Sequence, residues 1–186
     1  MRARTVADPY DLARFVTAQE GDFERACAEL EAGAKRTHWM WYVFPQLQGL
    51  GRSAMAERYA IADVGEARAY LNHPVLGPRL RTAVEAAMRS SERDPSRLFG
   101  SPDDLKFRSS LTLFAAADPT ETVFEDALTA FYGGEADGDT LERLGLPRKP
   151  PRRSRRFSSP RRDARAHGCG GQVALDGSVR REKGLG

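Results

Sequence analysis

Apolar side chains recur three and four positions apart along most of the chain, which is the spacing of a helix with one buried face. Short polar residues followed by proline stand at the starts of several of these runs, where the side chain can cap a helix and proline costs no hydrogen bond. The pairs of this kind are Asp8-Pro9, Asp94-Pro95, Ser101-Pro102 and Asp118-Pro119. We therefore predict an all-α fold, with helices near residues 9–20, 22–32, 38–44, 53–61, 64–72, 78–91, 95–99, 102–117, 120–132 and 140–144.

Further helix boundaries follow from capping-box spacing at Asp63 with Glu66 and at Asp139 with Glu142. No run alternates between apolar and polar residues as a half-buried strand does. The segment 39–44 is apolar on all sides and short, so its periodicity also fits a buried strand. We favour a helix because Thr37 can cap it and Pro45 ends it.

The composition divides the chain into three parts. Residues 1–7 form a flexible N-terminus, residues 8–146 form a single compact multihelical domain, and residues 147–186 form a tail rich in arginine, proline and serine. The tail has almost no large apolar side chains, so it cannot offset its ordering entropy by burial. We predict that this tail is disordered.

Charge follows the same division. The net charge is +3, but residues 147–186 carry twelve Arg or Lys against three acids, which leaves seventeen against twenty-three in residues 1–146. An acidic body repels phosphate overall, so nucleic-acid contact is expected only through the basic tail. Only Cys27 and Cys169 are present, and no segment is apolar enough to cross a membrane. These observations favour a cytoplasmic protein without disulfides.

Aromatic and cationic residues are concentrated in KRTHWMWYVFPQLQGLGRS, residues 35–53. Such residues most often build a hydrophobic core. The alternative is a binding pocket in which Trp41 or Tyr42 stacks on a planar ligand. The candidates for polar contacts at its rim are His38, Gln46, Lys35 and Arg36, and Trp39 is a further ligand-binding candidate. On this alternative His38 can act as an acid or base.

Gly49 and Gly51 precede Arg52 and Ser53, and we place the N-cap of a helix at Ser53. This arrangement suggests an anion site at the helix N-terminus, and the alternative is that the glycines only permit a tight turn.

The run SPDDLKFRSSLTLF places Lys106 three and four residues before Ser109 and Ser110. A lysine–serine pair can form a nucleophile, whereas a solvated helix face or close helix packing accounts for the same spacing. His73 and Arg79 have the pattern of turn and surface residues. The histidines have no partners at metal-ligand spacing, so we predict no bound metal. We predict no cofactor either.

Four motifs together resemble the bacterial "domain of unknown function 1810" family: THWMWYVFPQLQGLGRSAMAERYAI, LNHPVLGPRLR, LFGSPDDLKFRSSLTLF and VFEDALTAFYGGEADGDTLERLG. The resemblance runs from about Asp8 to Gly145 and implies a multihelical cytosolic domain, with no established activity or cofactor. Leu111 stands where the family commonly has methionine, and the tail departs from the family pattern. The polar motif positions that the resemblance adds as pocket candidates are His38, Gln46, Ser53, Tyr59, His73, Arg79, Asp104, Lys106, Ser109, Ser110, Thr112 and Tyr132.

Three hypotheses about function remain open. The first is a domain that binds or processes a nucleotide-like or phosphate-bearing small molecule in an aromatic and basic pocket. The second is a protein-interaction module without catalysis, and the third is nucleic-acid contact through the tail. The sequence does not decide whether the protein is an enzyme.

Overall fold

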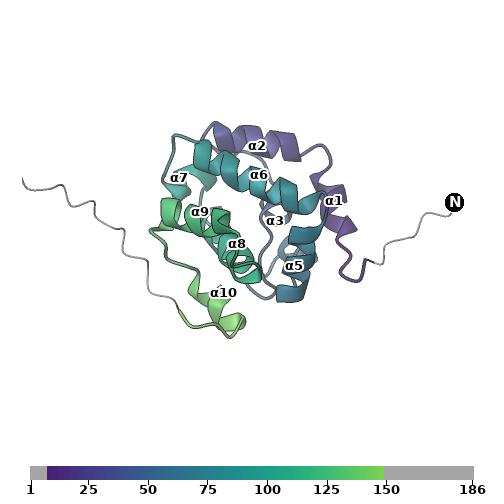
Figure 1. The fold of residues 1–186 in the computed structure, drawn as a ribbon. Coiled ribbons are helices and arrows are strands. Elements are labelled where there is room, and N and C mark those ends of the chain that lie inside the picture. The colour runs from purple at the N-terminus through teal and green to yellow at the C-terminus, as the bar shows by residue number, and fades with distance from the viewer. Residues whose placement is uncertain (1–7, 149–186) are drawn as a thin grey trace, which may run out of the picture. The chain divides into compact units, whose positions relative to one another are not determined.

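The computed structural model describes residues 8–148, which form ten helices and no strand (Figure 1). The helices are α1 (Ala13–Gln19), α2 (Phe23–Glu31), α3 (Met40–Val43), α4 (Ala54–Arg58), α5 (Val64–Asn72), α6 (Leu76–Arg89), α7 (Pro95–Phe99), α8 (Asp103–Ala117), α9 (Thr122–Tyr132) and α10 (Gly138–Arg143). The all-α prediction is thus confirmed for this part of the chain. The predicted flexible N-terminus (residues 1–7) and the predicted disordered tail beyond residue 148 lie outside the described residues.

Helix α8 lies at the centre of the fold, where it contacts α3, α5, α7, α9 and α10 (Figure 1). Its side chains are therefore buried on several sides. Phe107 and Phe114 are fully buried, and so are Leu113 and Ser110, so of the two alternatives for the face that carries Ser110 the structure has close helix packing. Leu105, although apolar, is 56% exposed. A helix surrounded by others lacks one apolar stripe, so its periodicity alone does not decide which faces are buried.

The ambiguous aromatic segment forms the short helix α3, so the helical alternative is confirmed. The chain then runs extended, and Leu47 makes an isolated parallel bridge with Ile61. The N–H of Ile61 donates to the Gln46 carbonyl at 2.8 Å, and the N–H of Gln48 donates to the Ile61 carbonyl at 2.8 Å. This pairing is why α4 ends at Arg58, three residues before its predicted end.

Several predicted caps are present, and others are displaced. The Asp94 carboxylate accepts from the Ser96 N–H at the start of α7, as expected. Helix α1 begins at Ala13 rather than Pro9 because Asp8 accepts from the N–H groups of Leu12 and Ala13, four and five residues later. Asp118 caps a turn before α9. No side chain caps α8, which Ser101-Pro102 was expected to begin. The peptide bond between Ser101 and Pro102 is cis.

Arg14 ties α1 to the segment that joins α4 and α5. Its guanidinium donates to the carbonyls of Arg58 and Ala60 at 3.0 and 2.9 Å and to the Glu66 carboxylate at 2.7 Å. It also donates to the carbonyls of Tyr10 and Asp11, just before α1. The Glu66 side chain is only 3% exposed, so this ion pair keeps a buried carboxylate partnered.

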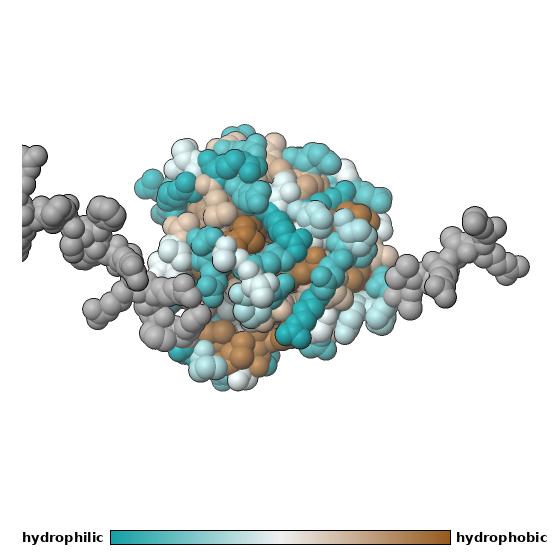
Figure 2. All heavy atoms as spheres, in the orientation of Figure 1, coloured by the Kyte–Doolittle hydropathy of each residue, from teal (hydrophilic) through white to brown (hydrophobic). Residues whose placement is uncertain are grey.

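Helices α5 and α6 approach closely at the short turn between them. A Cβ atom on Gly77 would lie 2.0 Å from the carbonyl oxygen of Leu71, so only glycine fits this position. On the outer surface, apolar colour gathers over α10 in an otherwise mostly polar view (Figure 2). The large apolar side chains exposed within residues 8–148 are Met55, Leu105 and Leu146.

Candidate functional site

Two lysines share one carboxylate at the start of α8. The Nζ atoms of Lys35 and Lys106 lie 2.6 Å from the two oxygens of Asp103. Lys35 is held there because its backbone N–H donates to the Leu98 carbonyl at 2.7 Å. The side chains of Lys35, Asp103 and Lys106 are 7%, 17% and 20% exposed, so one net positive charge is largely shielded from water.

The two ammonium groups keep Asp103 ionised. Partial burial alone would raise the pKa of its carboxyl, but the hydrogen bonds from Lys106 and Lys35 outweigh burial and lower the pKa below its ordinary value. Because both carboxylate oxygens are occupied, Asp103 orients the lysines and is poorly placed to take up a proton.

The lysines also lie on the two tryptophans. Lys106 Nζ is 4.8 Å from the ring centroid of Trp41, and Lys35 Nζ is 5.3 Å from that of Trp39. Trp39 is fully buried, and its indole N–H donates to Glu29 at 2.8 Å. Trp41 is only partly buried, so it can present a surface to a ligand. We call Lys35, Trp41, Asp103 and Lys106 the lysine–tryptophan cluster.

The serines expected beside Lys106 do not contact its ammonium group. Side chains on a helix lean toward its N-terminus, so Lys106 reaches back to Asp103 rather than forward to Ser109 and Ser110. Ser110 is 1% exposed, and its Oγ has no hydrogen-bond partner within residues 8–148. No lysine–serine nucleophile is formed in this arrangement.

Thr112 and Tyr132 occupy structural positions between helices. Thr112 Oγ1 accepts from the N–H of Asp137 at 2.9 Å, just before α10. The Tyr132 hydroxyl donates to the Asp104 carbonyl at 2.6 Å and so connects α9 to α8. Burial and the nearby Asp104 carboxylate raise the pKa of Tyr132, which keeps its hydroxyl protonated.

The other sequence candidates make no polar or ring contact with the cluster among the described residues. Ser53 caps α4 by accepting from the Ala56 N–H at 3.1 Å, as predicted, but α4 has only five residues. Tyr59 packs on Phe15 and is 7% exposed. His38, Arg52 and Ser53 are exposed, and Gln46 is partly buried. No hydrogen bond, ion pair or ring contact of the described residues joins these side chains to the lysine–tryptophan cluster.

The sequence motifs indicated Lys35 and Lys106 but missed Asp103, which holds them together. The pairing of Asp103 with Lys106 three residues later is visible in the sequence, whereas the contact with Lys35 spans 68 positions of the chain. Between residues 8 and 148, no group of three or more His, Cys, Asp or Glu side chains could hold a metal ion. No helix of this region is long and apolar enough to cross a membrane.

These features define an all-α domain with a central helix whose first turn carries a shielded cluster of cationic and aromatic side chains. The chain belongs to the family described as "Protein of unknown function (DUF1810)", whose model matches residues 9–144. A similar solved structure is the conserved hypothetical protein Rv1873 from Mycobacterium tuberculosis, at 47% sequence identity and a TM-score of 0.73. The match covers 75% of this chain and 100% of that chain. The comparison with curated proteins found no match.

Proposed function

We propose that this domain binds a phosphate-bearing, nucleotide-like small molecule at the lysine–tryptophan cluster. The observation that carries the proposal is the unequal pairing of charge: Lys35 and Lys106 share the single carboxylate of Asp103, next to the partly exposed ring of Trp41. Charge-assisted hydrogen bonds from lysine to phosphate are among the stronger polar contacts in proteins.

The two parts of such a ligand have different partners in the cluster. A phosphate group accepts hydrogen bonds from Lys106, the more exposed of the two lysines. A planar base stacks on Trp41 once Lys106 moves off the ring, because an indole face attracts both cations and aromatic rings. Lys35 is 7% exposed and supplies a fixed positive charge behind them.

Calorimetric titration of the full chain with ADP, adenosine and inorganic phosphate tests the proposal. ADP is expected to bind more tightly than either of the other two, because it alone has both the charge and the ring. Lys106→Ala removes one charge-assisted hydrogen bond and is expected to weaken ADP binding about tenfold. Trp41→Ala is expected to weaken binding of ADP and adenosine but not of phosphate.

Arg97→Ala is the matched control, because it removes a cation from α7 whose side chain is 76% exposed and far less shielded than Lys106. Equal losses for Arg97→Ala and Lys106→Ala would show a general charge effect and contradict a site at the cluster. The absence of any binding heat with ADP would also contradict the proposal and would turn attention to protein partners.

A further inference from the structure

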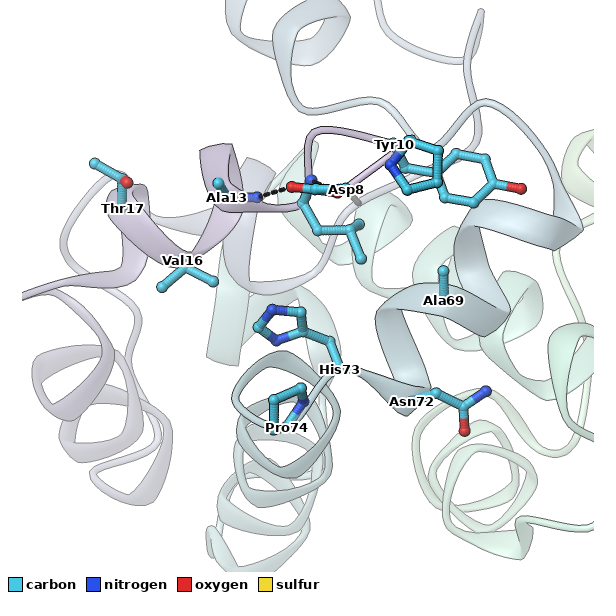
Figure 3. A pocket seen from close by; sticks show the side chains of 11 residues that line it. Asp8, Tyr10, Ala13, Val16, Thr17, Ala69, Asn72, His73 and Pro74 are labelled. Carbon is cyan, nitrogen blue, oxygen red and sulfur yellow. Dashed lines mark hydrogen bonds between the residues drawn. The ribbon is translucent and has the colours of Figure 1, made fainter. Parts of the chain in front are cut away.

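A pocket lies between α1 and the turn that joins α5 to α6 (Figure 3). Its volume is about 550 Å³, which is within the range of small-molecule sites. Leu12, Val16, Ala69 and Pro74 contribute apolar walls, and Asp8 and His73 contribute polar groups. Among residues 8–148, those that line the pocket include no lysine or arginine, so its chemistry differs from that of the lysine–tryptophan cluster.

The hydrogen bonds of His73 fix which ring nitrogen carries a proton. Nδ1 accepts from the backbone N–H groups of Val75 and Leu76 at 3.2 and 3.3 Å, at the start of α6. A nitrogen that accepts is unprotonated, so the neutral imidazole carries its proton on Nε2. Figure 3 shows the ring pointing from the α5–α6 turn toward α1. No atom within residues 8–148 accepts a hydrogen bond from Nε2, which leaves a fixed donor at the pocket.

Asp8 supplies negative charge to the same pocket. Its two oxygens accept from the N–H groups of Leu12 and Ala13 at 2.8 and 3.0 Å. The hydrogen bond from Leu12 is the main reason that the pKa of Asp8 lies below its ordinary value. The carboxylate is therefore ionised at neutral pH, and its remaining lone pairs can accept from a ligand.

We propose that this pocket binds a neutral, mainly apolar molecule with one head group that both accepts and donates hydrogen bonds, such as a hydroxyl or a carboxamide. The head group accepts from Nε2–H of His73 and donates to Asp8, while the apolar body lies on Leu12, Val16 and Ala69. Asp8 repels an anionic ligand, and no lysine or arginine of residues 8–148 lines the pocket to attract one. The site is independent of the proposed nucleotide site.

Titration of the full chain by ¹H–¹⁵N NMR tests this inference with benzyl alcohol and benzamide as probes, and with benzoate and toluene as matched controls. Benzyl alcohol and benzamide are expected to shift the amide resonances of Leu12, Val16 and Ala69. Benzoate has the same ring with an anionic head, and toluene has no polar head. Both are expected to bind at least about tenfold more weakly, since each lacks a favourable polar contact.

His73→Asn distinguishes the role of His73 in the pocket from its role at the start of α6, because asparagine also accepts hydrogen bonds from free N–H groups at a helix start. This variant is expected to keep the unfolding midpoint of the wild type and to weaken benzamide binding about tenfold. Ala69→Leu fills the pocket and is expected to abolish the shifts, whereas Lys106→Ala leaves them unchanged.

Two results would overturn the inference. The first is the absence of shifts at pocket residues with saturating benzamide in the wild type. The second is equal affinity for benzamide and benzoate that is unaffected by His73→Asn. Because Lys106 does not line this pocket, loss of ADP binding in Lys106→Ala tests only the nucleotide site, and the two proposals fail separately.

Discussion

At the scale of single residues, Glu29 organises the approach to the aromatic segment. Its carboxylate accepts from the N–H groups of Arg36 and Thr37 at 2.8 and 3.1 Å, from Thr37 Oγ1 at 2.8 Å and from Trp39 Nε1 at 2.8 Å. Partial burial alone would raise the pKa of Glu29, but these hydrogen bonds outweigh burial and lower the pKa to about 2 from 4.5. One carboxylate thus fixes the loop that carries Lys35.

The lowered pKa of Glu29 predicts a loss of stability in acid. The stabilisation is complete above the unfolded-state pKa of 4.5 and disappears as the pH falls toward the folded-state pKa of about 2. After allowance for solvent screening of this partly exposed group, we expect a contribution of about 1–2 kcal/mol. Urea unfolding at pH 6 and pH 2.5 should show a smaller decrease for Glu29→Gln than for the wild type. Equal decreases would contradict this role.

The close approach of α5 and α6 at Gly77 gives a second prediction at the scale of single residues. Gly77→Ala places a methyl group 2.0 Å from the Leu71 carbonyl oxygen, so α5 and α6 must move apart. We expect the free energy of unfolding to fall by about 3 kcal/mol, at the upper end of the usual cost of overpacking. Thr82→Ala, at an exposed position of the same helix, should change it by less than about 0.5 kcal/mol. A small effect at Gly77 would mean that the turn can relax.

At the scale of elements, α10 shows a cap that differs from the sequence prediction. The capping-box spacing indicated Asp139, but Asp137 accepts from the N–H and Oγ1 of Thr140 at 2.9 and 2.6 Å. We expect Asp137→Ala to lower the free energy of unfolding by about 1 kcal/mol and Asp139→Ala to leave it nearly unchanged. Thermal unfolding of the two variants side by side distinguishes the positions, and a larger effect at Asp139 would reverse the assignment.

Local sequence patterns predicted where the helices are better than they predicted what packs around each helix. The caps at Asp94, Asp63 and Ser53 are local hydrogen bonds between residues two or three apart, so the sequence displays them directly. The burial of Ser110 depends on how many helices surround α8, and the position of Lys35 depends on a partner far along the chain. Those properties arise from packing, which a single sequence does not display.

At the scale of the whole molecule, the separation of charge predicts where nucleic acid can bind. Residues 147–186 carry twelve Arg or Lys against three acids, and the body is acidic. We expect the full chain to bind a DNA oligonucleotide weakly, with an affinity that falls at least about tenfold between 50 and 200 mM salt. Deletion of residues 147–186 should abolish this binding in a fluorescence anisotropy assay and leave ADP binding intact. Affinity that survives the deletion would exclude the tail as its source.

The contacts of Arg14 with the Glu66 carboxylate and with the segment before α5 have a consequence for local unfolding of the protein. Separation of α1 from α5 would leave the buried Glu66 carboxylate without its cation, so the two helices should open together. Their amide protons are then expected to exchange with solvent at one shared free energy. Since residues of α1 and the end of α5 also line the pocket that contains His73, we expect that pocket to keep its shape before any ligand binds. The pocket would then select its ligand by shape complementarity to a preformed site, without closure of the protein around the ligand.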